Sequence, residues 1–345
     1  LQLLVRKGRH PAAFKCGPDY IDPMFHESVI GIQSRNIDTF FTDAPTTRQI
    51  MARSAVSCDV AVMEGVMGYY DGLGGVSTQA SAYDAACVTD TPVILLVNAR
   101  GASVSLLPLI CGFRDFRTDS HIRGVILNQL SPSLYPQMKA LIEQKTGLTV
   151  YGYVPSMPDC TLESRHLGLV LPAEIPDIRR KLDRAADQLE KSLDWEGLLT
   201  LAGQARELAV PEPVQAPGAA GSGVLTGLPP VGSSLPAAGV SLTDGEAGAA
   251  PLRIALAKDE AFCFIYQENL QVLRELGAEL VPFSPLHDKV LPENCRGLLL
   301  YGGYPELYAE TLSRNYAMRE SIRRAAADGL PVIAECGGFL YLQEA

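Results

Sequence analysis

A lysine and two carboxylates lie close together near the start of the chain. Lys15 is followed by a Gly-Pro pair and then by Asp19 and Asp22. The apolar residues 11–14 before them are typical of the end of a buried strand. A strand cannot continue through glycine and proline, because proline lacks the N–H group that a ladder requires. We therefore expect these charged side chains on a loop at the carboxyl end of a strand, where open α/β sheets bind their ligands.

Carboxylates beside a lysine suit a site for magnesium and a nucleotide. Magnesium takes oxygen ligands that it shares with phosphate, and an ammonium group neutralises phosphate charge. Two more acids extend the set, since Glu64 ends the apolar run 60–63 and Asp71 lies in the glycine-rich loop that follows. A solvated loop or a helix cap would explain any one of these acids. The prediction therefore depends on all four meeting at one edge of a sheet.

Cys336 is the second candidate for chemistry. It stands between the run 331–335 and a Gly-Gly pair that opens a helix. This layout is typical of a nucleophile elbow, with the sulfur at a helix N-terminus whose partial positive charge favours the thiolate. Nearby backbone N–H groups, including those of Gly302 and Gly303, are candidates for an oxyanion hole. A structural cysteine at a strand end is the plainer alternative, but the tight turn favours a nucleophile.

A thiol nucleophile needs a base, which is normally a histidine. His287 is the only histidine in the second half of the chain, and it lies in a loop between two expected strands. We do not assign it as the partner of Cys336, so the base stays unassigned.

Apolar runs that alternate with helical spans position these side chains. In the first half they follow the pattern of repeated βα units and predict a parallel sheet; the runs are 11–14, 60–63, 92–98, 122–128 and 150–154. The second half repeats the pattern, with runs at 253–258, 279–283, 296–301 and 331–335. The sequence therefore predicts an α/β fold throughout.

The composition changes sharply in the middle of the chain. Residues 209–251 are rich in glycine, proline, alanine and serine, and no aromatic residue occurs between Trp195 and Phe262. Such a segment buries too little surface to offset the entropy of ordering it. We therefore predict a flexible linker at 209–251 between a first domain, 1–208, and a second domain, 252–345.

Overall charge and cysteine usage narrow the class of protein. The 345 residues carry a net charge of −10, which argues against a general role at nucleic acid or membrane surfaces. The eight cysteines show no CxxC pair, and the sequence shows no signal peptide and no apolar run long enough to span a bilayer. We predict a soluble cytoplasmic protein, and a homodimer stays open as its state of assembly.

Residues 14–26, which read FKCGPDYIDPMFH, resemble the FKCGPDYIDPxFH signature of the cobyrinic acid a,c-diamide synthases. The second half resembles class I glutamine amidotransferases around Cys336. The resemblance implies a first domain with the P-loop fold of dethiobiotin synthetase, acting as an ATP-dependent synthetase. It implies a second, flavodoxin-like amidotransferase domain. The family's P-loop would precede residue 1 and its triad histidine would follow the cysteine, so we expect a part of a longer protein.

The activity implied by this resemblance joins the two domains. Glutamine is hydrolysed at Cys336, and the ammonia passes to the first domain. There ATP, with Mg²⁺, phosphorylates the a and c side-chain carboxylates of cobyrinic acid in turn, and ammonia displaces the phosphate. Hydrogenobyrinic acid and nickel sirohydrochlorin remain alternative substrates, and a catalytically inactive amidase-like binding module is an alternative of a different class. Cobyric acid synthase is disfavoured, because it replaces the Gly-Pro-Asp-Tyr-Ile-Asp passage.

The resemblance also implies roles for individual residues. For ATP, Lys15 binds phosphate and Asn128 reads the adenine base, while Asp19 and Glu64 serve the magnesium ion. Asp19, Asp22 and Asp71 are implied in the formation of the acyl phosphate. The implied substrate contacts are Tyr20, Ile21, Arg165 and His166, where the family often has leucine at position 21; the implied oxyanion donors are Gly302, Gly303 and Gly337. Tyr301 departs from the glycine that is common before the Gly302-Gly303 pair.

Overall fold

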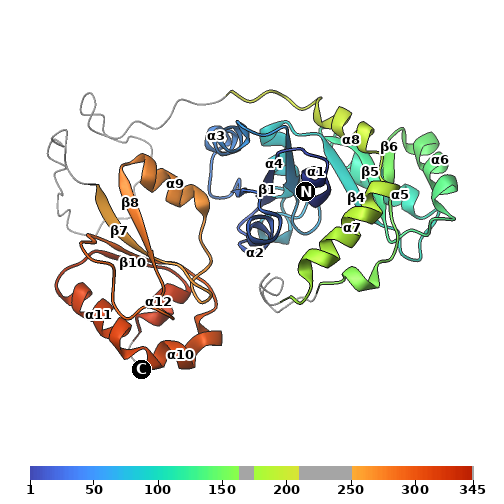
Figure 1. Cartoon of the computed structure of the whole chain (residues 1–345). Helices are drawn as coiled ribbons and strands as arrows, with labels where there is room; N and C mark the ends of the chain where they lie inside the picture. The colour runs from blue at the N-terminus through green and yellow to red at the C-terminus, as the bar shows by residue number, and fades with distance from the viewer. Residues whose placement is uncertain (163–174, 210–250, 344–345) are drawn as a thin grey trace. The chain divides into compact units, whose positions relative to one another are not determined.

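The computed structural model describes residues 1–162, 175–209 and 251–343 (Figure 1). The chain forms two compact units, Leu1–Pro211 and Glu212–Ala345. The predicted linker 209–251 spans the boundary between them, and all of it except its two end residues lies outside the described ranges. Each unit therefore has its own core and its own sheets.

The first unit contains two parallel sheets of three strands each, in the orders β2-β1-β3 and β4-β5-β6. Their strands are β1 (Pro11–Cys16), β2 (Ser34–Ile37), β3 (Val60–Glu64), β4 (Val93–Asn98), β5 (Ile122–Asn128) and β6 (Thr149–Val154). Parallel pairing confirms the predicted α/β class. The expectation of one sheet was wrong for the described strands, because β3 pairs only with β1 and β4 only with β5. Apolar runs identify buried strands but do not encode which strands are neighbours.

Helices accompany the strands of the first unit (Figure 1). They are α1 (Gln2–Arg6), α2 (Ile21–Phe25), the π-helix η1 (His26–Ile30), α3 (Ala44–Ala55), η2 (Leu73–Gly75), α4 (Ala82–Thr89), α5 (Leu106–Asp115), α6 (Tyr135–Thr146), η3 (Pro158–Cys160), α7 (Ile178–Ser192) and α8 (Trp195–Ala202). Ion pairs Arg6–Asp187 and Lys7–Glu190, at 2.7 and 2.8 Å, join α1 to α7. The start of the chain is therefore fixed to the amphipathic helix near the end of this unit.

Strand β1 is the centre of the first sheet. All six of its residues are buried, and Phe14 packs in a core with Ile37 of β2, Met51 of α3 and Ala85 of α4. A strand covered on both faces by apolar neighbours cannot shift its register without exposing them. The polar residues that leave this strand at its carboxyl end therefore have fixed positions.

The second unit is built on one four-stranded parallel sheet in the order β10-β9-β7-β8. Its elements are β7 (Leu252–Ala257), α9 (Gln267–Glu275), β8 (Ala278–Phe283), β9 (Leu298–Leu300), η5 (Pro305–Tyr308), α10 (Ala309–Arg314), α11 (Tyr316–Ala327), β10 (Val332–Ala334) and α12 (Gly337–Tyr341). Phe262, Leu300 and Met318 lie in its core without exposure to solvent. No helix in the described part of the chain is both long and apolar enough to cross a bilayer.

Candidate active sites

Lys15 lies at the centre of a cluster of acids in the first unit. Its Nζ forms a salt bridge with Asp22, lies 3.2 Å from Oε1 of Glu64 and 3.8 Å from Oδ2 of Asp19. The pairing of β1 with β3 explains the contact with Glu64, because Lys15 and Glu64 are direct partners in the parallel register. Only 4% of Lys15 is exposed. Three of the four predicted acids therefore meet around one buried ammonium group.

The loop after β1 holds Asp19 through hydrogen bonds to its neighbours. Gly17 adopts a φ of +75°, a left-handed conformation that glycine accommodates without strain and that turns the chain out of the strand. The side-chain amide of Asn36 then donates to the carbonyl oxygens of Gly17 and Asp19, at 2.9 and 2.6 Å. The Asp19 carboxylate accepts from the N–H of Ile21 at 2.8 Å. The end of β2 therefore fixes the loop that carries the acid.

Partial burial sets the protonation behaviour of this cluster. It raises the pKa of Glu64 and of Asp19, and the charge of Asp22 raises the pKa of Asp19 further. Burial alone would lower the pKa of Lys15, but its hydrogen bond to Asp22 and the charge of Glu64 outweigh that effect and raise it. Lys15 therefore stays charged. When ionised, the three carboxylates carry more negative charge than the one ammonium group neutralises, so the cluster attracts a further cation.

The carboxylates alone do not form a cage for a metal ion. The described residues contain no group of three or more metal-ligating side chains placed to hold one. Lys15 Nζ occupies the space between the acids. Magnesium commonly uses only one or two protein carboxylates together with substrate phosphates and water. Asp19 and Glu64 fit that shared mode, because both side chains are partly exposed.

His26 is a member of this site to which the sequence assigned no role, although it ends the FKCGPDYIDPMFH motif. Its Nδ1 lies 2.9 Å from the Ser34 hydroxyl, and its Nε2 lies 3.7 Å from Oε2 of Glu64. Burial lowers the pKa of His26 from 6.5 to about 4. The ring is therefore neutral near neutral pH, and its Nε2 faces the Glu64 oxygen that Lys15 does not contact.

The low pKa of His26 predicts an acid-dependent loss of stability. Between pH 6.5 and about 4 the unfolded chain binds a proton that the folded protein does not, so the free energy of unfolding falls as the pH is lowered through this window. Without divalent cations we expect a loss of about 2 kcal/mol between roughly pH 7 and pH 5 from this group. Urea unfolding at both pH values measures this loss of unfolding free energy. The loss should be smaller in His26→Gln by the part that His26 contributes. An equal pH dependence in both proteins would contradict the prediction.

Asp71 differs from the three acids around Lys15, because its carboxylate forms a hydrogen bond within its own loop. Its carboxylate accepts from the N–H of Gly68 at 3.0 Å, which closes a turn within the loop after β3. The hydroxyls of Tyr69 and Tyr70 donate to the carbonyls of Ser120 and Phe113, at 2.6 and 2.7 Å, and tie this loop to the segment before β5 and to α5. Asp71 is exposed on a fixed turn, so a contact with substrate remains a prediction.

The predicted substrate contacts differ in exposure. Tyr20 is partly exposed at the start of α2, whereas Ile21 is 4% exposed and packs into the unit. Arg165 and His166 lie outside the described residues. Tyr20 is therefore accessible to a substrate beside the cluster, whereas Ile21 packs inside and supports α2.

Asn128 lines a cavity in the second sheet of this unit. It ends β5, and the cavity of about 560 Å³ lies between the carboxyl ends of β5 and β6. Its lining includes Arg100, Gln129, Val154 and Met157. A cavity of this size can hold a small molecule, and several of its lining residues are polar. The residue predicted to read the adenine base therefore lines a pocket at the carboxyl end of the second sheet, and its role remains a prediction.

Cys336 occupies the turn between β10 and α12. Its φ of 50° and ψ of −114° are unusual for a residue with a side chain, as at a nucleophile elbow. Gly302 packs against it, since a Cβ on Gly302 would lie 3.5 Å from the Cys336 sulfur. A Cβ on Gly337 would lie 3.3 Å from the backbone nitrogen of Gly303. The predicted oxyanion residues thus lie together beside the turn that carries the exposed Cys336.

The structure places His287 at the other edge of the same sheet. It follows β8, whereas Cys336 follows β10, and these outer strands are separated by about 14 Å at the usual strand spacing. Its Nε2 lies 3.0 Å from a carboxylate oxygen of Glu260. This placement agrees with leaving His287 unassigned as the base.

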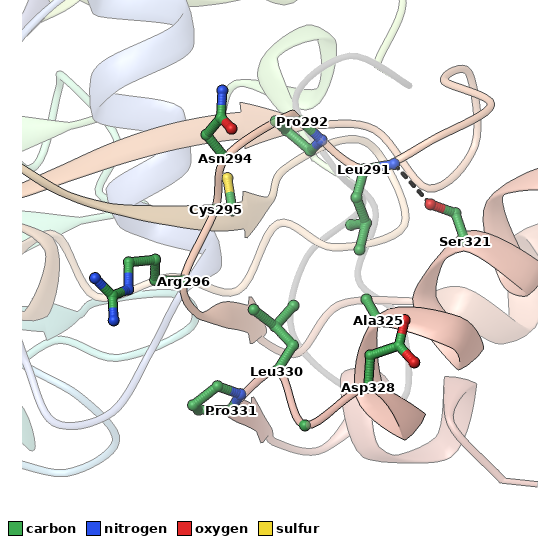
Figure 2. A pocket seen from close by; sticks show the side chains of 11 residues that line it. Leu291, Pro292, Asn294, Cys295, Arg296, Ser321, Ala325, Asp328, Leu330 and Pro331 are labelled. Carbon is green, nitrogen blue, oxygen red and sulfur yellow. Dashed lines mark hydrogen bonds between the residues drawn. The ribbon is translucent and has the colours of Figure 1, made fainter.

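A cavity of about 530 Å³ in the second unit belongs to neither candidate site (Figure 2). Leu291, Cys295 and Ser321 line it, together with residues that precede β10. The Ser321 hydroxyl accepts a hydrogen bond from the N–H of Leu291 at 3.1 Å. The cavity lies at the amino ends of the strands, whereas Cys336 lies at a carboxyl end, so it does not contribute to the thiol site.

Comparison with known proteins identifies the family of this chain. Residues 253–345 match the CobB/CobQ-like glutamine amidotransferase domain. Cobyrinate a,c-diamide synthase from Salmonella typhimurium is 38% identical over 349 aligned positions, which cover 99% of this chain and 68% of the relative. The enzyme of that name from Priestia megaterium is 34% identical over 342 positions, with the same coverage of both chains. The chain belongs to the cobyrinate a,c-diamide synthase family.

Membership in the cobyrinate a,c-diamide synthase family confirms the resemblance read from residues 14–26. A third relative, from Dehalococcoides mccartyi, is 36% identical over 343 positions, covering 99% of this chain and 68% of its own. The alignments include both units, so the similarity extends to the Lys15 cluster as well as to the amidotransferase domain. The amidotransferase match covers the turn at Cys336 and most of the described second unit.

Proposed function

We propose that this chain belongs to an enzyme that uses glutamine and ATP to convert the a and c carboxylates of cobyrinic acid into amides. Family membership supports the substrate, because the relatives carry the name cobyrinate a,c-diamide synthase. The observation that carries the proposal is the convergence of Asp19, Asp22 and Glu64 on Lys15. Such a site suits the transfer of a phosphoryl group, which needs positioned charges rather than a protein nucleophile.

The second unit supplies the nitrogen in this proposal. The Cys336 thiolate attacks the side-chain amide carbon of glutamine, and the N–H groups of Gly303 and Gly337 donate to the resulting oxyanion. Ammonia leaves after taking up a proton, and water hydrolyses the thioester to release glutamate. Two close approaches support this assignment: Gly302 lies against the Cys336 sulfur, and Gly337 lies against the backbone nitrogen of Gly303. The base that moves the proton stays unassigned.

The first unit consumes the ammonia. A substrate carboxylate oxygen attacks the γ-phosphorus of ATP, which gives an acyl phosphate and ADP. Ammonia then attacks the acyl carbon, phosphate leaves, and an amide remains. Lys15 stabilises the negative charge on the transferred phosphoryl group, and Asp22 holds Lys15 in place through its salt bridge. Asn128 contacts the adenine base in the cavity beside β5 and β6.

Magnesium has a place in this proposal through Asp19 and Glu64. When bound, the ion would neutralise phosphate charge. A bound cation would also favour the ionised forms of both acids, and so oppose the burial that raises their pKa values. The part of Asp71 in forming the acyl phosphate rests on the position of its loop. Hydrogen bonds hold this loop, and it begins directly after Glu64 in the sequence.

The test is an assay of the full-length protein with glutamine, ATP, Mg²⁺ and cobyrinic acid. We expect two successive conversions of a carboxyl into an amide, each with release of ADP, phosphate and glutamate. Hydrogenobyrinic acid and nickel sirohydrochlorin, assayed in parallel, should give lower kcat/KM. A protein that binds these compounds but shows no turnover would support an inactive binding module instead.

A further inference from the structure

One buried histidine at the first site is not used by the proposed chemistry. His26 starts η1, directly after α2, and only 7% of the residue is exposed. Its two ring nitrogens have different surroundings. Nδ1 lies 2.9 Å from the hydroxyl oxygen of Ser34, at the start of β2, and Nε2 faces Oε2 of Glu64 at 3.7 Å. The ring therefore links two strands of the sheet across the site.

The two groups that face the ring nitrogens, the Ser34 hydroxyl and the Glu64 carboxylate, together bear on where the imidazole carries its proton. A neutral ring has one N–H donor and one acceptor nitrogen, and a hydroxyl can serve either. If Nδ1 carried the proton, the lone pair of Nε2 would face the Glu64 carboxylate and repel it. With the Ser34 hydroxyl donating to Nδ1, the N–H at Nε2 points toward Glu64. Electrostatics therefore favour the Nε2–H tautomer.

Lys15 and His26 face different oxygens of the same carboxylate. Lys15 Nζ lies 3.2 Å from Oε1 of Glu64, and His26 Nε2 lies 3.7 Å from Oε2. We propose that His26 is a positioning residue that fixes the orientation of the Glu64 carboxylate, and that Ser34 acts by holding His26 in the Nε2–H tautomer. This inference rests on the proposed function of the Lys15 cluster.

Glu64 needs such support because its side chain is exposed by 51% and has three rotatable bonds. A single contact with Lys15 leaves the carboxylate free to rotate about that contact. Displacement of a reacting or ligating group by about 1 Å can cost ~10²-fold in rate, and loss of a residue that orients a ligand costs ~10–100-fold. His26 removes this freedom without touching the substrate.

The test compares two replacements of His26 in the full-length enzyme. Glutamine can place an amide N–H near the position of Nε2, whereas leucine has a similar volume and no donor. We expect His26→Leu to lower kcat for amidation with ammonia by ~10–100-fold, with little change in glutamate release from glutamine. His26→Gln should restore most of the lost rate. His121→Leu, which removes a histidine 3.6 Å from Asp90 elsewhere in this unit, is the matched control and should leave kcat unchanged.

A spectroscopic measurement decides the tautomer independently of turnover. The ¹⁵N chemical shifts of the His26 ring should show Nε2–H in the unmodified protein and a mixture of tautomers in Ser34→Ala. A ring that carries its proton on Nδ1 would overturn the inference, as would a folded His26→Leu enzyme with unchanged kcat. If the unmodified enzyme lacked activity on cobyrinic acid, the proposed function would fail while the ring shifts still reported on His26.

Discussion

Replacing Cys336 with alanine will abolish amidation that depends on glutamine and will leave amidation with free ammonia close to the unmodified rate. The thiol is the only group at the β10–α12 turn that can form the thioester, and no neighbouring glycine can replace it. We expect glutamate release to fall by at least ~10³-fold, as when a nucleophile is removed. The measurements are glutamate release and amide formation, each with glutamine and with ammonium chloride as the nitrogen source.

The control for this replacement is Cys295→Ala in the same unit. Cys295 lines the cavity at the other end of the sheet (Figure 2). Its replacement should therefore leave the rate of amidation unchanged with glutamine and with ammonia. Glutamate release by Cys336→Ala at the unmodified rate would show that the elbow is not the glutaminase site. A loss of the reaction with ammonia as well would mean that the replacement disturbs the first unit.

Replacing Asp22 with asparagine will stop amidation with either nitrogen donor. Asp22 forms a salt bridge with Lys15, whose side chain is 6% exposed, and the amide keeps the shape of the side chain but removes its charge. Lys15 would lose the partner that holds it in position for phosphate. We expect a fall of ~10²–10³-fold in kcat/KM, the range for losing one charge-stabilising group in an active site. The rate of ADP release that accompanies amidation should fall by the same factor, while glutamate release from glutamine continues.

Asp43→Asn is the matched control, because it makes the same chemical change in the same unit. Asp43 caps α3 by accepting from the N–H of Thr46 at 2.9 Å, and asparagine is an equally good cap. This variant should keep its activity and its thermal stability. If Asp22→Asn and Asp43→Asn both kept the unmodified amidation rate, the Lys15 cluster would not be the synthetase site.

Local sequence was enough to predict many parts of this protein. The Gly-Pro break after Phe14 and Lys15 predicted a loop at a strand end, and β1 indeed ends at Cys16. The run before Cys336 and the glycines after it predicted the elbow that the φ and ψ of this residue show. These features depend on backbone preferences of a few adjacent residues, which a sequence displays directly.

Tertiary structure alone decided which distant residues meet. Glu64 faces Lys15 because β1 and β3 pair in one register, and Ser34 reaches His26 because β2 lies on the other side of β1. Asp71, so close to Glu64 in the chain, instead closes its own turn. Strand order and register arise from the packing of whole faces against the core, so they are properties of the assembled sheet rather than of any short segment.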